Sequence, residues 1–370
     1  MNDSAAPIVD LEPTTSELIE MFYQLSFFLV GTPINIAAFV KTKKYMREGG
    51  MESRLLRLSR QLLIAHLLVL SIYGVWRSYW FYNIVWIQGD FLCKVFSFMT
   101  ALPFHLWSNL VAAIAVDMLF CITSPLNSYR TAEHRVTSLI AISWGAAVIC
   151  SIPMLILRGT IKIGASGEDG EFEQCYPLVN VYSPEALIAF SVFHVLTSFY
   201  IPLFIVIICY SIIGFSLRRQ MAERKTLHMG RAVHYLSVDT TGCQKKKKQN
   251  CAKARFLRAT AAIIATFVTT WLPYQILALV RVTCDENGLC QRITSKLTWL
   301  QAIIIASTCI NPFLYRFGDS GKKLSSKSCT NTETALRTNN SYSIKRTRSN
   351  SSGNVPGTRM GRFTPDRPFV

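Results

Sequence analysis

Charged residues are scarce in this chain of 370 residues. Only 16% of its residues are Asp, Glu, Lys or Arg, whereas 50% are hydrophobic and the mean hydropathy is +0.28. An ordinary soluble domain carries about 25% charged residues, so the chain is too apolar for that class. The composition predicts a membrane protein.

Seven mainly apolar runs are long enough to cross about 30 Å of hydrocarbon, which requires roughly 20 residues. They lie near residues 20–42, 57–80, 94–121, 136–157, 187–214, 258–282 and 294–316. The sequence therefore predicts an all-α integral membrane protein. We expect a seven-transmembrane helix bundle at residues 21–316, an N-terminal tail at 1–20 and a disordered C-terminal tail at 317–370.

Residues 1–20 contain acidic residues but no lysine or arginine, and the connection after the first run is rich in both. Loops rich in Lys and Arg stay in the cytoplasm, so we expect the N-terminus outside the cell and the C-terminus inside. The missing basic segment argues against a cleavable signal peptide. Asn2 opens a glycosylation sequon on the outer side. The net charge of +17 then collects on one membrane face beside anionic lipids, and nucleic acid is not needed to explain it.

The cysteines include no CxxC pair, so a zinc site is not indicated. Cys93 and Cys175 both fall on the outer side of the predicted bundle, where a disulfide persists. Cys284 and Cys290 also fall outside, but sequence does not give their separation, and their pairing stays open. We expect no metal and no cofactor.

Some residues within the predicted spans are costly in lipid. Proline removes a backbone donor, so we expect bends at Pro153, Pro202, Pro273 and Pro312. For His66, a neutral imidazole bonded between helices is the more common role than a metal ligand. Polar groups inside a membrane cost free energy unless they pair, which makes each a functional candidate: Asn35, His66, Asp117, Asn311 and Tyr315.

Several motifs follow in order over residues 30–320: Asn35, Cys93, Trp144 with Pro153, Pro202 with Tyr210, "FVTTWLPY" at 267–274 and "NPFLY" at 311–315. Together they resemble the motifs of the rhodopsin-like G-protein-coupled receptors. A finer resemblance, to the gonadotropin-releasing-hormone, adipokinetic-hormone and corazonin receptors, is carried by "WIQGDFLCKVFSF", with Trp86, Gly89, Asp90, Cys93 and Lys94. Vasopressin-type receptors share many of these features.

The resemblance implies a conformational switch, and this sequence departs from it. Where the family has Asp-Arg-Tyr, this chain has Asp117 followed by Met118, so the switch arginine is missing. We expect Asp117 to be protonated or paired with a base such as Arg135 or Arg130. The implied switch residues are Asn35, His66, Asp117, Met118, Pro202, Tyr210, Phe267, Trp271, Pro273, Asn311, Pro312 and Tyr315.

A second departure concerns the sodium site of the family. His66 stands in place of the usual aspartate, and Trp107 in place of a small hydroxyl residue. An imidazole and an indole do not form an oxygen-rich cation site. We therefore expect no sodium dependence, and a hydrogen bond between His66 and Asn311 in the ion's place.

The resemblance also implies a ligand cavity that opens outward between spans three, five, six and seven. Thr100 argues against an amine ligand, which needs a carboxylate partner, and Ile305 stands where an opsin carries its Schiff-base lysine. The expected ligand-binding residues, each of which could instead serve helix packing, are Arg77, Thr100, Phe104, His194, Trp271, Tyr274, Gln275 and Trp299.

Basic stretches at 215–225 and 251–258 are expected to frame a groove for a partner helix. We expect a plasma-membrane receptor whose partners are an extracellular peptide hormone, a heterotrimeric G protein, arrestin-like proteins and membrane lipids. The alternative is a decoy or heteromer-forming receptor that signals little by itself. A transporter is disfavoured by the few charged mid-span residues. No nucleophile, base and orienter appear together, so an enzyme is not expected.

Overall fold

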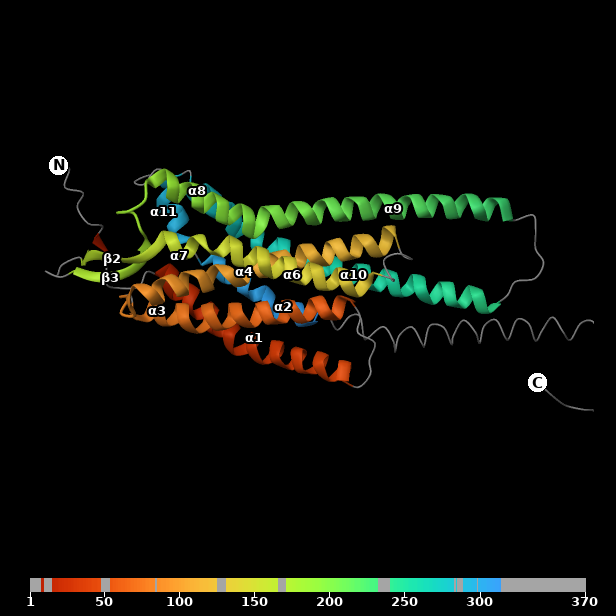
Figure 1. The fold of residues 1–370 in the computed structure, drawn as a ribbon, viewed down its shortest axis with the longest axis horizontal. Helices are drawn as coiled ribbons and strands as arrows, with labels where there is room; N and C mark the ends of the chain where they lie inside the picture. Colours follow the sequence, from red (N-terminus) through yellow and green to blue (C-terminus); the bar gives the residue numbers. More distant parts are fainter. Residues whose placement is uncertain are drawn as a thin grey trace, which may run out of the picture. The chain divides into compact units, whose positions relative to one another are not determined.

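The structure is a computed structural model that describes residues 8–9, 15–47, 54–83, 85–124, 131–165, 171–231, 240–282, 284, 289–297 and 299–313. Long helices run side by side in it (Figure 1). Within the described residues, six helices are long and apolar enough to cross a membrane: Thr15–Lys44, Arg54–Trp80, Gly89–Thr123, Ala132–Leu157, Pro184–Glu223 and Leu257–Val282. A shorter apolar helix, Leu300–Phe313, follows them.

Several of these spans are built from more than one element. The first is part of α1 (Thr15–Arg47), the third is α4 (Gly89–Thr123) and the sixth is part of α10 (Thr240–Val282). The second joins α2 (Arg54–Ser71), the π-helix η1 (Ile72–Arg77) and α3 (Ser78–Asn83). The fourth joins α6 (Ala132–Ser151) and α7 (Pro153–Leu157), and the fifth joins α8 (Pro184–Val195), the π-helix η2 (Leu196–Tyr200) and α9 (Ile201–Arg231).

The first six predicted spans each fall inside one of these helices, but the bound of the N-terminal tail and the last span need correction. Helix α1 begins at Thr15, and Glu20, assigned to the tail, is 1% exposed in its second turn. The predicted span 294–316 is divided: α11 (Leu289–Lys296) ends before the apolar helix begins at Leu300. The polar residues of α11, such as Arg292 and Lys296, do not suit hydrocarbon.

The connection after the fourth span forms an antiparallel hairpin, which was not predicted from the sequence. Strand β2 (Arg158–Ala165) pairs with β3 (Glu171–Pro177), and β1 (Ile8–Val9) runs parallel to β2 on its other edge. Ile161 and Ile163 are buried while Lys162 between them is exposed. This period of two is the pattern of a half-buried strand.

Two of the four prolines coincide with a change of helix type. The π-helix η2 ends two residues before Pro202, and Pro153 starts α7 after the chain leaves α6. Proline has no N–H to donate, so a widened or interrupted turn satisfies the neighbouring backbone. Pro273 lies within α10, and Pro312 in the last turn of the final helix.

Helix α4 is the centre of the bundle. It packs against α2, α6, α7 and α9 and against strand β2. Its buried Leu106, Trp107 and Leu110 meet Phe199 of η2 and Phe267 of α10 in one apolar cluster. A helix that is apolar on all sides is typically buried among others. Because α4 contacts most of the bundle, it can transmit a conformational change from one end to the other.

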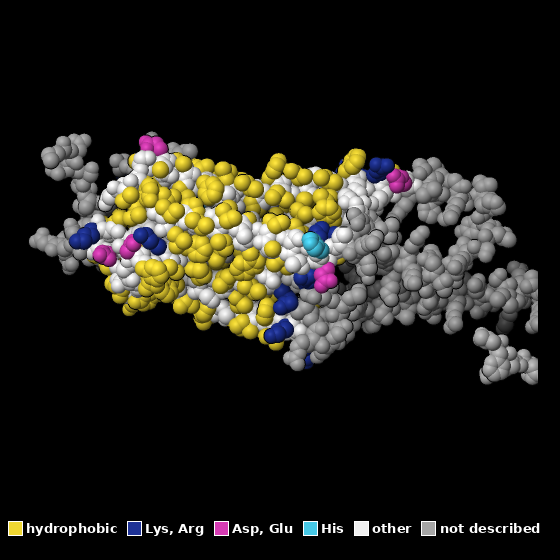
Figure 2. All heavy atoms as spheres, in the orientation of Figure 1, with side chains coloured by type: hydrophobic (Ala, Val, Ile, Leu, Met, Phe, Trp, Pro, Cys, Tyr) yellow, Lys and Arg dark blue, Asp and Glu magenta, His cyan; other side chains and the backbone are white. Residues whose placement is uncertain are grey.

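The outer surface is apolar across its middle. Figure 2 shows hydrophobic side chains over the centre of this face and the described charged side chains near its two ends. Leu29, Ile142 and Phe204 are 64–70% exposed. Such a band suits contact with lipid tails, because a soluble surface of this extent would be an aggregation hazard.

Candidate ligand and switch sites

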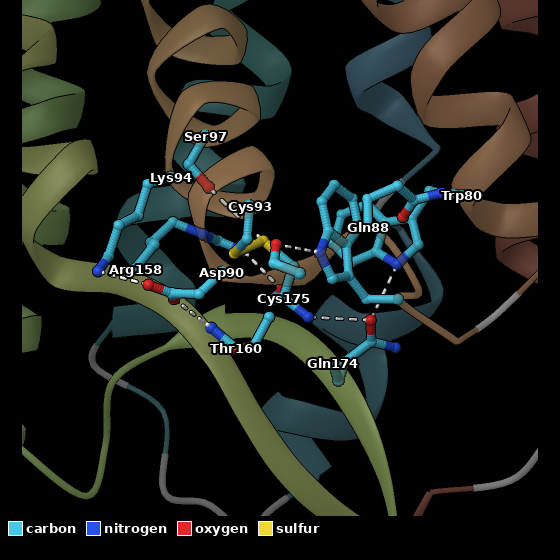
Figure 3. Close-up of a disulfide and its surroundings, with 12 residues drawn as sticks. Trp80, Gln88, Asp90, Cys93, Lys94, Ser97, Arg158, Thr160, Gln174 and Cys175 are labelled. Atoms are coloured by element: carbon cyan, nitrogen blue, oxygen red, sulfur yellow. Dashed lines mark hydrogen bonds and ion pairs between the residues drawn. A yellow bond between two sulfur atoms is a disulfide. The ribbon is translucent and has the colours of Figure 1, made fainter.

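The hairpin is fastened to the start of α4 by a disulfide. Cys93 and Cys175 are bonded at an S–S distance of 2.02 Å, as predicted. The Asp90 carboxylate accepts the Thr160 N–H at 3.0 Å and pairs with Lys94 Nζ at 2.6 Å (Figure 3). The hairpin strands therefore lie over this end of the bundle, which we call the hairpin end. A second disulfide joins Cys284 and Cys290, the pair left open by the sequence.

The "WIQGDFLC" segment supplies the corner beside that disulfide. Gly89 has a φ of +76°, a conformation that favours glycine. The indole Nε1 of the buried Trp86 donates to the Gly89 carbonyl at 2.9 Å, and the Trp86 N–H donates to Glu173 in β3 at 3.0 Å. The residues that carry the finer resemblance thus build the joint between α4 and the hairpin.

An ion pair lies between α1 and η1 at the hairpin end. Arg77 Nε donates to Glu20 Oε1 at 3.1 Å, and Gln24 Nε2 donates to the same oxygen at 2.5 Å. The Arg77 guanidinium also lies over the Tyr73 ring at 5.5 Å. Arg77, which was expected to bind the ligand, is therefore already paired with Glu20 of α1.

A second arginine at this end lacks such a partner. Arg158, the first residue of β2, donates from Nη2 to the Cys175 carbonyl at 3.3 Å, and its buried Nε has no hydrogen-bond acceptor. Burial, and then the like charge of Arg77, lower its pKa from 12.5 to about 10. Figure 3 shows Arg158 beside the disulfide, in line with its bond to the Cys175 carbonyl. Arg158 was not predicted as a site residue, although a basic residue directly after an apolar run is a visible signal.

The expected pivot Trp271 lies among aromatic rings. Its ring centroid is 5.4 Å from Phe104, 5.2 Å from Trp107 and 4.8 Å from Phe267. The edge-to-face arrangement of the first two pairs is favourable for aromatic rings. Phe104 and Trp271, both predicted ligand residues, are thus brought together.

The structure shows fewer contacts between the other predicted ligand residues. The Thr100 hydroxyl donates to the Ser97 carbonyl at 2.7 Å, so its donor is used within α4. Tyr274 lies within electrostatic range of Arg77 and Glu20. Gln275 is buried in α10, and Trp299 precedes the final helix with no described contact to the others.

His194 has an aromatic neighbour that the sequence analysis missed. The His105 and His194 rings lie 4.9 Å apart, edge to face, between α4 and α8. His105 Nε2 bonds the Thr197 hydroxyl at 3.1 Å, whereas His194 Nδ1 is buried without a partner. In the sequence, nothing distinguishes His105 from the other polar residues of the predicted spans.

A polar network connects three helices in the middle of the bundle. His66 Nδ1 lies 3.2 Å from Asn35 Oδ1, and His66 Nε2 lies 3.3 Å from Asn311 Nδ2. Asn35 Nδ2 donates to the Gly31 and Thr308 carbonyls at 2.8 and 3.0 Å. One neutral tautomer satisfies both contacts, with Nδ1–H donating to Asn35 and Nε2 accepting from Asn311. The predicted His66–Asn311 hydrogen bond is present.

Known proteins match this arrangement over most of its length. The family model "7 transmembrane receptor (rhodopsin family)" matches residues 36–315. The chain is a rhodopsin-family receptor. The "G-protein coupled receptor daf-38" of Caenorhabditis elegans is 24% identical over 85% of this chain and 92% of its own. The "Gonadotropin-releasing hormone receptor" is 24% identical in Cavia porcellus, over 82% and 90%, and 28% in Canis lupus familiaris, over 72% and 79%.

Membership fixes the seven-helix bundle, with Leu300–Phe313 in the seventh helix, and places the receptor in the plasma membrane as a multi-pass protein. Receptors of this family are not enzymes. The family model ends at residue 315. Asn2 and Tyr315 lie outside the described residues.

At the end of the receptor opposite the hairpin, Asp117 of α4 is paired. Arg135 Nη2 and Nε lie 2.7 and 3.0 Å from Asp117 Oδ1, and Arg54 Nε lies 4.0 Å from Oδ2. Asp117 is 1% exposed. The pairing with Arg135 was one of the two predicted states, and Arg54 of α2 was not foreseen.

Met118 points into an apolar cluster. It is 1% exposed and packs with Ile122 and with Ile213 of α9, against which Leu257 of α10 is packed. Tyr210 OH donates to the Thr260 hydroxyl of α10 at 2.7 Å beside this cluster. In this receptor, α4, α9 and α10 thus meet through apolar side chains around Met118.

Proposed function

We propose that the receptor binds a peptide hormone of the gonadotropin-releasing or adipokinetic type at its hairpin end and signals through a heterotrimeric G protein. The similarity to gonadotropin-releasing-hormone receptors over more than two thirds of the chain is the observation that carries this proposal. The polar groups Arg77, Glu20 and Arg158 support it, because Tyr73 and Phe104 connect Arg77 to the ring of Trp271. Few polar groups over apolar walls are typical of ligand sites.

The proposal places the hairpin end outside the cell. Lys41, Lys43 and Lys44 lie at the opposite end of α1, and the Asp117 end of α2 begins with Arg54 and Arg57. Such basic residues favour the cytoplasmic side. The Cys93–Cys175 bond suits an oxidising compartment. On the inner side, phosphorylated tail serines would recruit arrestin-like proteins and basic residues would meet anionic lipids.

The alternative is a decoy or heteromer-forming receptor, and the burial of Met118 favours it. In the family an arginine at this position leaves the acid on activation and meets helix five and the G protein. Here the acid is bound by Arg135 instead, and Met118 offers no charge. G-protein coupling must then proceed without that guanidinium, or be weak.

One experiment separates these possibilities. Cells expressing the native receptor, Met118→Arg or Met118→Leu are exposed to gonadotropin-releasing and adipokinetic-type peptides while binding, calcium and cyclic AMP are measured. A native response supports the coupled receptor. Binding without response in the native chain, with a response in Met118→Arg only, supports the decoy. Absence of binding to all three receptors contradicts the proposal.

A further inference from the structure

Among the described residues of the hairpin end, one partly buried arginine, Arg158, has no carboxylate partner. Arg77 and Arg158 are both described there, and Glu20 is bound to Arg77 at 3.1 Å. Arg158 has the Cys175 carbonyl at 3.3 Å and no carboxylate within ion-pair distance among the described residues. Within this part of the chain the Glu20–Arg77 pair is neutral and Arg158 adds a charge of +1.

The position of Arg158 is not that of a residue reaching toward water. Arginines near a span end often extend along apolar surface to the solvent. Here Nη2 turns inward to the carbonyl of Cys175, which is 0% exposed, and Nε is buried without an acceptor. A guanidinium held in such a place without a counter-ion is costly. The fold therefore keeps a charge that its own contacts do not require.

The surroundings of Arg158 coincide with the proposed ligand region. Arg158 lies within electrostatic range of Tyr73 and Arg77 on one side, of Tyr176 on the hairpin, and of His194 on α8. These groups come from the second span, the hairpin and the fifth span. Its side chain is only partly buried, so an incoming group can reach it from between these elements.

We infer that Arg158 anchors a carboxylate of the ligand. This inference rests on the proposed peptide-receptor function and names the chemistry that the site selects. A carboxylate accepts two parallel bonds from a guanidinium, and the long side chain of Arg158 would turn to offer its unused Nε–H together with an Nη–H. The carboxylate belongs to an acidic side chain of the peptide or to a free C-terminus, since both present the same planar anion.

The test uses matched peptides. Each gonadotropin-releasing or adipokinetic-type peptide is prepared as a neutral amide, as an amide with one Asn or Gln replaced by Asp or Glu, and as a free acid. Binding is measured on membranes with the native receptor, Arg158→Gln and Lys162→Gln. Lys162 is the control because it is an exposed cation on the same strand.

We expect an anionic form to bind the native receptor and Lys162→Gln at least about tenfold more tightly than the neutral form, and Arg158→Gln to lose that preference. Whichever anionic form is preferred identifies the source of the carboxylate. Equal binding of the three forms to the native receptor, or a preference that survives Arg158→Gln, overturns the inference and leaves the peptide-receptor proposal standing. If no peptide binds the native receptor, both are overturned.

A stability measurement guards against a purely structural role. Arg158→Gln removes a charge that has no counter-ion within the described part of the chain, so the thermal midpoint of the purified receptor should stay unchanged or rise. Arg77→Gln instead strips Glu20 of its partner and should lower it. A fall for Arg158→Gln as large as that for Arg77→Gln means that Arg158 holds the hairpin together, and overturns the inference.

Discussion

Each end of the bundle includes a buried carboxylate and two nearby guanidinium groups, in different arrangements. At the opposite end, Asp117 lies 2.7 Å from Arg135 and 4.0 Å from Arg54, so one acid is shared by two bases. At the hairpin end, Glu20 binds Arg77 alone, and Arg158 turns to a backbone carbonyl. In the first set every charge has an opposite charge beside it, whereas in the second Arg158 has no counter-ion among the residues that the structure describes.

The difference indicates which end of the bundle has a charge that a bound ligand would neutralise. A carboxylate enclosed by two cations is held in a fixed arrangement and does not need a further ligand. A buried cation without a counter-ion is stabilised when an anion arrives, so its cost is recovered only in the bound state. The proposed anion preference therefore belongs to the hairpin end, whereas the charges around Asp117 are already paired with one another.

The largest effect should come from detaching the hairpin. Cys93→Ser removes a cross-link between residues 82 positions apart, which should lower the free energy of unfolding by about 4–5 kcal/mol. Surface expression and the thermal midpoint measure it. Cys150→Ser is the control, since that cysteine is free and half-buried. If surface expression stays normal, the hydrogen bonds of Asp90 and Trp86 to the hairpin are sufficient to hold it, and the disulfide is not what positions Arg158.

Breaking the Glu20–Arg77 pair at the hairpin end should have the second-largest effect. Arg77→Gln leaves Glu20 buried without its cation, which should cost about 3–5 kcal/mol. The double variant Glu20→Gln with Arg77→Gln should regain most of the loss, because no charge remains uncompensated. Thermal unfolding of the four receptors forms a double-mutant cycle. Additive losses would mean that the two groups do not stabilise each other.

Removing one of the two arginines that share Asp117 should cost less free energy than breaking the Glu20–Arg77 pair. Arg135→Gln leaves Asp117 with Arg54 at 4.0 Å, so the expected loss is about 2 kcal/mol rather than the value for an isolated buried charge. Arg219→Gln, in an exposed pair with Glu223, is the control and should cost at most about 0.5 kcal/mol. A loss for Arg135→Gln as large as that for Arg77→Gln would contradict the view that Arg54 shares the acid.

The sequence was most informative where the chemistry is local to a segment. Apolar run length placed the first six spans, and compartment reasoning found Cys93 and Cys175. The break before Leu300 was missed, because a helix and a capped turn with similar apolar content look alike in a run-length argument. The hairpin was missed although "TIKI" shows the strand period.

Pairings between distant segments were harder to foresee. His66 with Asn311 was predicted because the family resemblance gave both positions a role. Glu20 was assigned to the acidic tail, since sequence alone does not say that Arg77 lies across from it. Arg158 went unnoticed for the converse reason, because what marks it is a missing partner. A missing contact cannot be recognised from the sequence, because it becomes visible only once the packing of the side chains is known.

The smallest effect concerns the neutral network between the two charged ends. His66→Ala removes two hydrogen bonds to Asn35 and Asn311, worth about 0.6 kcal/mol each in membranes, so a loss of about 1–2 kcal/mol is expected. Exchanging sodium for potassium should leave the native thermal midpoint and ligand binding unchanged, because the imidazole already fills the contacts a cation would use. His66→Asp combined with Trp107→Ser restores the residue types of the family's cation site and should acquire sodium dependence. If the native receptor responds to sodium as that double variant does, a cation binds between the two ends after all, and the bundle is not held there by neutral hydrogen bonds alone.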